Sequence, residues 1–399
     1  MNHEVDATRS SVLVVGTSAA GLATAESLRR LGHRGPLTLL DAEPHPPYDR
    51  PPLSKQFLAG QWERERLMLR PEPVLADLGA CIRRGERALA LDVAARSVRT
   101  DRAELQADHI VLATGLRPRT LAGRGGGDDA VHVLRSLEDA ARLRDAVGPD
   151  SAVVVVGDGV LGSEIAATLS GIVRQVTLVG SARGPMAGSL GALGSALLAD
   201  MHAAAGVRMV RGARAARVHG AGGPGAGVEL EDGRLLPADV VVLAIGSVPC
   251  TAWLEGSGLA LEDGIVCDPS GRAAEGVWAA GDAARWHHVG LGRDVRLENR
   301  AHATEMGLAV ARNILGADRP YAPIPSFWTD HYGVRIQVFG ALGHDGALEV
   351  VDGDAEEGRF VAVSRREGRT TGVLGWAMPK QARLRSREID AFTPARVPA

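Results

Sequence analysis

The sequence is short of cysteine, of lysine and of long apolar runs, and the lack of cysteine pairs and of long apolar runs excludes several classes of protein. Its 399 residues include three cysteines, Cys81, Cys250 and Cys267, which are too far apart for a CxxC pair, a zinc ribbon or an iron–sulfur ligand set. An odd number of cysteines is also a poor disulfide framework, so we expect a protein of the reducing cytoplasm. The histidines lack the spacing of metal ligands, and no metal site is predicted.

No apolar run approaches the roughly 18 to 20 residues of a membrane-spanning helix, and no hydrophobic signal segment follows the polar residues 1–11. The formal net charge is −3, from 45 Lys and Arg against 48 Asp and Glu. Neither nucleic acid nor an anionic membrane is therefore predicted as a partner. Lysine occurs only at Lys55 and Lys380, which makes each lysine a candidate for a specific role.

Two segments of the chain share one pattern of strand, glycine turn, helix and strand. Residues 11–16 are a short apolar run, residues 22–31 are patterned as a helix, and a second apolar run ends at Asp41. The same order recurs about 140 residues later, over residues 152–179. This repetition predicts two βαβ units, each able to bind one nucleotide.

The remaining pattern predicts how these units are assembled. Buried runs at residues 110–114 and 277–280 each lead into a glycine, which suggests that the first domain resumes after the second. From residue 321 the runs are short and alternating, as in an antiparallel sheet. We predict an α/β protein with two Rossmann-like domains and a small α+β C-terminal domain. The predicted domains span residues 1–115 with 246–322, residues 116–245, and residues 323–399.

The glycine turn of the second unit is a full GxGxxG, formed by Gly157, Asp158, Gly159, Val160, Leu161 and Gly162. The first glycine makes the turn, the second lets a pyrophosphate approach the backbone, and the third lets the helix meet the strand. In this βαβ setting the motif predicts dinucleotide binding, with an ordinary glycine turn as the alternative.

The turn of the first unit reads Gly16, Thr17, Ser18, Ala19, Ala20 and Gly21. Ser18 stands where the middle glycine is usual and is small enough to keep the approach open. Asp41 follows Gly21 by twenty residues, at the place where an acid binds ribose hydroxyls. An ordinary solvated aspartate is the alternative reading of Asp41.

Together with residues 50–55, 113–115, 280–282 and 327–330, these motifs give the chain a family likeness. It resembles the FAD-dependent ferredoxin reductases of the putidaredoxin and rhodocoxin reductase type, in the pyridine nucleotide-disulfide oxidoreductase superfamily. The resemblance implies FAD on the first unit and NADPH or NADH on the second.

The resemblance also implies roles for single residues. Asp41 would bind the adenosine ribose, Arg50 the FAD phosphates or ribose, and Ala88 the adenine through its backbone. The implied FAD contacts are Gly16, Ser18, Ala19, Ala20, Gly21, Asp41, Arg50, Lys55, Ala88, Ala113, Thr114, Gly115, Arg135, Gly281, Asp282, Arg300 and Trp328. The implied NAD(P)H contacts are Gly157, Gly159, Val160, Leu161, Gly162, Glu164, Gly180, Ser181, Arg183, Ile245 and Gly246.

For catalysis the resemblance implies an ion pair of Lys55 and Glu164 beside the flavin N5 atom. A positive charge there favours the anion formed on reduction, and the glutamate would orient the lysine and the nicotinamide amide. Trp328 would lie near the flavin, with a place in the core as the alternative reading. Arg300 replaces a residue that is usually apolar in relatives, and it either tunes the flavin or points outward.

No redox-active cysteine pair is available, so electrons must leave the flavin without a sulfur relay. The resemblance implies single-electron transfer to a [2Fe–2S] ferredoxin, which would supply a cytochrome P450 or another oxygenase. The alternatives are another acceptor, such as rubredoxin, a nitrite reductase component or oxygen. A further alternative is an NAD(P)H-sensing flavoprotein of the apoptosis-inducing-factor type.

The second unit departs from NADH-using relatives at the end of its second strand. Gly180 stands where those relatives carry an acid, and Ser181 and Arg183 follow. An acid about 4 Å from a 2′-phosphate costs on the order of 4 kcal/mol at an effective dielectric constant near 20. Its loss predicts that NADPH is preferred or equally tolerated, with Arg183 as a phosphate ligand.

Overall fold

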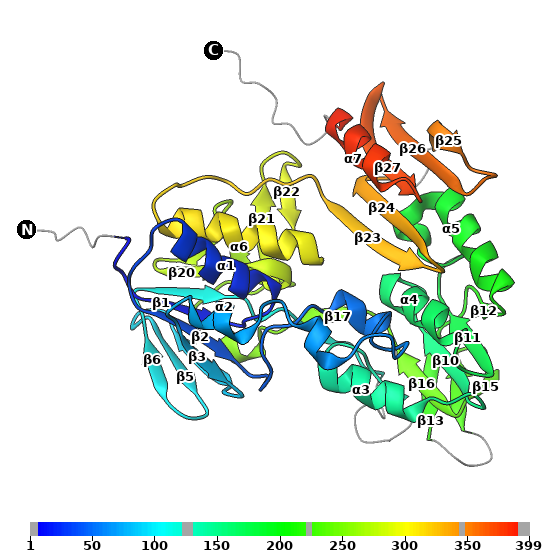
Figure 1. The fold of residues 1–399 in the computed structure, drawn as a ribbon, viewed down its shortest axis with the longest axis horizontal. Coiled ribbons are helices and arrows are strands. Elements are labelled where there is room, and N and C mark those ends of the chain that lie inside the picture. Colours follow the sequence, from blue (N-terminus) through cyan, green and yellow to red (C-terminus); the bar gives the residue numbers. More distant parts are fainter. Residues whose placement is uncertain (1–6, 122–130, 221–225, 343–347, 390–399) are drawn as a thin grey trace, which may run out of the picture.

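A computed structural model describes residues 7–121, 131–220, 226–342 and 348–389 (Figure 1). The first sheet has the order β19-β20-β7-β1-β2-β3 and is parallel except at β19. Its strands are β1 (Val12–Val15), β2 (Leu37–Asp41), β3 (Cys81–Arg84), β7 (His109–Leu112), β19 (Arg272–Ala274) and β20 (Val277–Ala279). Helices α1 (Ala19–Arg30) and α6 (Arg300–Ile314) pack against each other beside this sheet. This assembly is called the first unit below.

The second sheet is parallel throughout and has the order β12-β11-β10-β16-β9. Its strands are β9 (Val131–His132), β10 (Ala152–Val156), β11 (Gln175–Val179), β12 (Arg208–Val210) and β16 (Val240–Leu243). The accompanying helices are α3 (Leu137–Ala146), α4 (Val160–Leu169) and α5 (Ala187–Ala204). This assembly is the second unit.

The two units repeat one topology, because in each the first strand lies between the strand that follows its helix and a strand from much later in the chain. The central strands β1 and β10 are almost wholly buried Val and Leu, as expected for parallel strands covered on both faces. Gly16 N–H donates to the Leu40 carbonyl and Gly157 N–H to the Val179 carbonyl, both at 2.8 Å. The register therefore sets Gly16 beside Asp41 and Gly157 beside Gly180.

Small antiparallel sheets surround these units. One contains β4 (Ala88–Asp92), β5 (Ser97–Thr100) and β6 (Glu104–Gln106), and the equivalent in the second unit contains β13 (Ala215–His219), β14 (Gly227–Leu230) and β15 (Leu235–Pro237). The chain crosses between units through the pair β8 (Leu116–Pro118) and β17 (Ser247–Pro249). The remaining elements are α2 (Glu72–Ala76), β18 (Ile265–Cys267), β21 (Ala284–His288) and β22 (Arg293–Val295).

The C-terminal part is an antiparallel sheet of order β23-β24-β27-β26-β25, which confirms the predicted architecture. Its elements are β23 (Ser326–His331), β24 (Val334–Gly340), β25 (Glu349–Asp354), β26 (Arg359–Arg366), β27 (Arg369–Trp376) and helix α7 (Pro379–Arg385). Its apolar face packs on α5, where Leu190 and Leu198 meet Ile336 and Phe360 (Figure 1). Strand β23 thereby lies along α4 of the second unit.

Across the described parts of the chain, none of the helices combines the length and the apolar character needed to span a membrane. The predicted domain boundaries stay a prediction. In chain order, β19 and β20 of the first sheet come after all the strands of the second sheet.

Candidate active site

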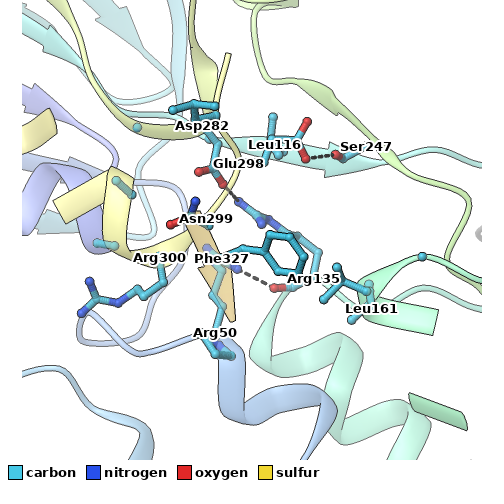
Figure 2. Close-up of a pocket in the computed structure, with 18 of the residues that line it drawn as sticks. Arg50, Leu116, Arg135, Leu161, Ser247, Asp282, Glu298, Asn299, Arg300 and Phe327 are labelled. Carbon is cyan, nitrogen blue, oxygen red and sulfur yellow. Dashed lines mark hydrogen bonds and ion pairs between the residues drawn. The ribbon is translucent and has the colours of Figure 1, made fainter. Parts of the chain in front are cut away.

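A cavity of about 760 Å³ opens where the carboxyl ends of both parallel sheets meet the C-terminal sheet (Figure 2). Ser18 and Asp282 line it from the first unit, Gly159 from the second, and Trp328 from β23. Ligands of open α/β sheets bind at this end of the strands. The cavity is therefore the place where two nucleotides carried by the two units would meet.

Many residues predicted from the sequence line this cavity. Those predicted to contact FAD are Ser18, Ala19, Ala20, Arg50, Lys55, Ala113, Gly115, Arg135, Gly281, Asp282, Arg300 and Trp328. Those predicted to contact NAD(P)H are Gly159, Val160, Leu161, Glu164 and Gly246. The predicted residues placed outside its lining are Gly16, Gly21, Asp41, Ala88, Thr114, Gly157, Gly162, Gly180, Ser181, Arg183 and Ile245. All these contacts stay predictions.

In both glycine turns the first and last residues must be glycine, because the protein's own backbone leaves no room for a Cβ atom there. A Cβ on Gly16 would lie 2.3 Å from the Ala113 carbonyl oxygen, and a Cβ on Gly157 would lie 2.1 Å from that of Ala244. Both residues also have positive φ, +95° and +112°. In contrast, a Cβ on Gly159 would meet no described atom within 4 Å. The small middle residue is thus not needed by the protein itself and suits a ligand that approaches the backbone.

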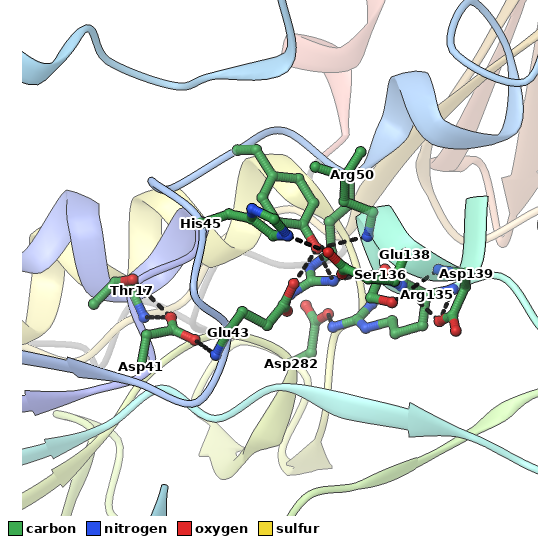
Figure 3. A network of polar contacts seen from close by, with 12 residues as sticks. Thr17, Asp41, Glu43, His45, Arg50, Arg135, Ser136, Glu138, Asp139 and Asp282 are labelled. Atoms are coloured by element: carbon green, nitrogen blue, oxygen red, sulfur yellow. Dashed lines mark hydrogen bonds and ion pairs between the residues drawn. The ribbon is translucent and has the colours of Figure 1, made fainter. Parts of the chain in front are cut away.

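Asp41 is held rigidly at the end of β2 (Figure 3). Its carboxylate accepts hydrogen bonds from the Thr17 backbone N–H at 2.7 Å, the Thr17 hydroxyl at 2.6 Å and the Glu43 backbone N–H at 2.9 Å. These donors orient the acid beside the glycine turn, and its predicted contact with an adenosine ribose stays a prediction.

A second polar cluster, centred on Arg50, lies beside the cavity (Figure 3). The Arg50 guanidinium bonds the Glu43 carboxylate at 2.6 Å and the Arg135 carbonyl at 2.6 Å, and it touches the Tyr48 hydroxyl at 3.1 Å. Burial raises the pKa of Tyr48, so the phenol stays neutral. Glu43 and Tyr48 were not identified from the sequence, because nothing in a proline-rich loop signals such contacts.

Arg135 and Asp282 complete the charged wall, with 3.6 Å between the guanidinium and the carboxylate. Burial raises the pKa of Asp282, and it lowers the pKa of Arg135. The Asp282 Oδ1 and Arg50 Nε atoms are buried and have no hydrogen-bond partner among the described residues. Buried polar atoms normally have partners, so these two fit a bound group with hydroxyls and phosphates, as FAD has.

The Lys55 ammonium and the Glu164 carboxylate form an ion pair of 2.7 Å, with side chains 12% and 7% exposed. The Ser54 hydroxyl donates to the same carboxylate at 2.6 Å, and the Thr329 hydroxyl donates to its other oxygen at 2.7 Å. Lys55 lies in the segment that connects β2 to β3 of the first unit, Glu164 lies on α4 of the second unit, and Thr329 lies on β23. The pair therefore joins all three parts of the molecule at the cavity.

The sequence reading of this pair was incomplete, because Ser54 and Thr329 were not recognised as its partners. Both stand in the motifs that carry the family resemblance, which is the signal that was available. Phe327, Glu298 and Asn299 also line the cavity without having been predicted (Figure 2). Asn299 caps α6, because its side-chain oxygen accepts hydrogen bonds from the backbone N–H groups of Ala301 and His302.

Arg300 directs its guanidinium away from the Arg135 and Asp282 pair (Figure 2). Its Nε atom lies 2.5 Å from the Asp49 carboxylate, and its Nη1 group contacts the Thr304 hydroxyl. Arg300 therefore lines the cavity as an arginine that is already ion-paired with Asp49. The sequence left open whether Arg300 tunes the flavin or points outward, and these contacts agree with the outward orientation.

The two nucleotide-binding turns at one cavity, with a charged wall on one side and a lysine–glutamate pair between them, define a dinucleotide-dependent redox protein. The family described as pyridine nucleotide-disulphide oxidoreductase matches residues 10–307, and the reductase C-terminal family matches residues 326–396. The chain belongs to the pyridine nucleotide-disulphide oxidoreductase family. It is an oxidoreductase whose cofactors are FAD and NAD(P)H.

Individual relatives narrow the comparison. The chain is 34% identical to the "probable ferredoxin reductase CtmF" of Castellaniella defragrans, over 95% of each chain. It is also 34% identical to rhodocoxin reductase of Rhodococcus erythropolis, over 96% of this chain and 89% of the relative. Among solved structures, that of the covalent putidaredoxin reductase–putidaredoxin complex matches with a TM-score of 0.88 and 30% identity, over 96% of this chain and 94% of the matched chain.

Proposed function

We propose that the chain is an NAD(P)H:ferredoxin oxidoreductase, which takes hydride from NAD(P)H and reduces a [2Fe–2S] ferredoxin. That ferredoxin would in turn supply a cytochrome P450 or another oxygenase in the cytoplasm. The observation that carries the proposal is the buried Lys55–Glu164 pair at the junction of both nucleotide units. The names of the relatives support the choice of acceptor, since they are ferredoxin and rhodocoxin reductases.

On this proposal the first unit holds FAD. Asp41 binds the adenosine ribose, Arg50 and Arg135 offset phosphate charge, and Asp282 accepts a hydroxyl of the ribityl chain. FAD, when bound, supplies the chemistry that accepts a hydride and passes electrons on singly. Trp328 and Phe327, on β23 of the C-terminal sheet, line the cavity beside this position.

Lys55 places a fixed positive charge where negative charge develops when the flavin is reduced, which lowers the barrier to hydride transfer. Glu164 holds the ammonium in place. Because Glu164 lies on α4 of the second unit, its carboxylate would also accept a hydrogen bond from the nicotinamide amide of NAD(P)H bound there. Ser54 and Thr329 hold the Glu164 carboxylate, so these two residues position the pair.

The three cysteines do not form a disulfide that could accept electrons from the flavin in place of a ferredoxin. Cys81 is exposed, Cys267 is buried, and Cys250 is partly buried, and all three are free. Burial raises the pKa of Cys267 to about 12 and also raises that of Cys250, so neither forms a thiolate readily. This supports direct electron transfer from the flavin to an external acceptor.

The acceptor is tested by reducing cytochrome c with NADH or NADPH, with and without added electron carriers. We expect a [2Fe–2S] ferredoxin to raise the rate at least tenfold, and a rubredoxin or oxygen alone to do far less. If the rate rose only with rubredoxin, the proposed acceptor would be rubredoxin instead of a ferredoxin. A long-lived reduced complex that passes electrons to no carrier would favour the sensing flavoprotein.

A further inference from the structure

The two units can be aligned residue by residue around their glycine turns. Glu86 N–H donates to the Asp41 carbonyl at 2.9 Å, and Ala213 N–H donates to the Gly180 carbonyl at 3.0 Å. Two residues after Asp41 and Gly180, the pattern repeats: Gly85 N–H donates to the Glu43 carbonyl and Gly212 N–H to the Ala182 carbonyl, both at 3.0 Å. The backbone therefore matches Asp41 with Gly180 and Glu43 with Ala182. In the turns themselves, Thr17 is matched with Asp158.

The side chain of Asp158 occupies the space that a side chain at position 180 would take. A Cβ built on Gly180 would lie 2.0 Å from both the Asp158 Cγ and Oδ2 atoms. Gly180 is thus a glycine because the neighbouring carboxylate is already there. The first unit has a hydroxyl in the turn and an acid at the strand end, and the second unit has an acid in the turn and no side chain at the strand end.

Matched backbone positions surround the carboxylate in both units. In the first unit the Thr17 and Glu43 N–H groups donate to Asp41. In the second unit, burial raises the pKa of Asp158, and hydrogen bonds from the N–H groups of Asp158 itself and of Ala182 oppose that rise. These two donors are the counterparts of Thr17 and Glu43. The two carboxylates therefore stand at one place in the repeated fold, although Asp41 ends a strand and Asp158 lies in a glycine turn.

We propose that Asp158 is the residue that binds the adenosine ribose hydroxyls of the nicotinamide nucleotide, and that it makes the chain prefer NADH over NADPH. The proposal rests on the proposed use of the second unit for NAD(P)H. A carboxylate accepts hydrogen bonds from the 2′- and 3′-hydroxyls but repels a 2′-phosphate. The prediction from Gly180 that NADPH is preferred or equally tolerated is replaced by this proposal.

The surroundings of Gly180 agree with this preference. A second cavity, of about 330 Å³, lies at the same sheet edge, and its lining includes Ser181 and Arg214 together with Glu231 and Asp232. Arg234 pairs with Asp232 at 2.7 Å, so the Glu231 carboxylate is left to offset Arg214, and the cavity presents no excess of positive charge to a 2′-phosphate. Arg183, the predicted phosphate ligand, is exposed and does not line this cavity.

The test uses the FAD-loaded protein and two ligands that lack the nicotinamide, ADP-ribose and 2′-phospho-ADP-ribose. Calorimetric titration measures their binding without turnover, and kcat/KM for NADH and NADPH is measured with ferricyanide. We expect the wild-type chain to favour ADP-ribose and NADH at least tenfold. Asp158→Asn should reduce that preference at least fivefold in both measurements, and Asp150→Asn, an exposed acid before β10, should leave it unchanged.

A transposed variant, Asp158→Thr with Gly180→Asp, copies the arrangement of the first unit and should restore the preference for ADP-ribose. It also keeps the proposal testable if Asp158→Asn fails to fold. Equal or tighter binding of 2′-phospho-ADP-ribose by the wild-type chain would overturn the proposal, as would an unchanged preference in Asp158→Asn. A large loss of NADPH activity alone in Arg183→Ala would also overturn it. Because binding is read without an acceptor, a failure of the ferredoxin assignment would leave these results intact.

Discussion

The first and second units repeat one backbone with different side chains at matched positions. Gly16 and Gly157 make the same turn, yet Asp41 ends β2 whereas Gly180 follows β11, and the acid of the second unit has moved to Asp158. The comparison shows that the two units hold a carboxylate at the same place in the fold, although residues at different positions of the repeat supply it. The matched backbone leaves one space for a carboxylate, which Asp41 fills in the first unit and Asp158 fills in the second.

The largest effects are expected when the first glycine of each turn is replaced by alanine, one unit at a time. In Gly16→Ala and Gly157→Ala the new Cβ lies 2.3 Å and 2.1 Å from a carbonyl oxygen, at positive φ, which costs about 1 to 3 kcal/mol in conformational strain before any clash. We expect Gly16→Ala to lose FAD and Gly157→Ala to keep FAD but lose nucleotide binding. The flavin-to-protein absorbance ratio and calorimetry with NAD+ measure the two losses.

The matching control is Gly159→Ser, which copies Ser18 of the first unit into open space. It should fold and bind FAD like the wild type. If Gly157→Ala instead lost its flavin and Gly16→Ala kept it, the assignment of the two nucleotides to the two units would be reversed.

The second test removes the charge at the junction of the units. Lys55→Ala should keep FAD bound but slow its reduction by NADH about 10-fold to 100-fold, because the positive charge beside the reacting atoms is lost. Stopped-flow absorbance of the flavin measures the rate. Lys380→Ala changes the other lysine, which is exposed on α7, and should have no effect. Equal reduction rates in both variants would rule out the role of Lys55.

A smaller effect is expected where the C-terminal sheet supports the same pair. Thr329→Val removes the hydroxyl that donates to Glu164 at 2.7 Å and leaves a buried carboxylate oxygen short of a donor, a cost of about 1 to 3 kcal/mol. Flavin reduction should slow about threefold to tenfold, with FAD content unchanged. Thr371→Val on β27, whose hydroxyl bonds within the sheet, is the matched control and should reduce flavin at the wild-type rate.

The smallest effect is expected at Arg300. Its ion pair with Asp49 has side chains 26% and 34% exposed, so screening limits its contribution to less than about 1 kcal/mol. Arg300→Ala should lower thermal stability slightly and leave the flavin reduction potential unchanged. A potential shifted by tens of millivolts would show that this arginine acts on the flavin after all.

Much of the fold was predictable because it follows local patterns. Buried runs of Val and Leu, glycines at fixed offsets and a change to short alternating runs indicated the two parallel sheets and the antiparallel one. The contacts that shape the site were harder to predict, because they join distant residues. Thr329 meets Glu164 across 165 positions, and Arg300 meets Asp49 across 251.

The sequence by itself determined the two glycine turns, the acid at Asp41, the lysine at position 55 and the lack of a cysteine pair, since each depends on residue type and local spacing. Only the tertiary structure decided which groups hold Glu164, where the Arg300 guanidinium points and which carboxylate stands beside Gly180. The physical reason is that a residue's neighbours across a sheet edge are set by strand order and register. Spacing along the chain does not encode those neighbours.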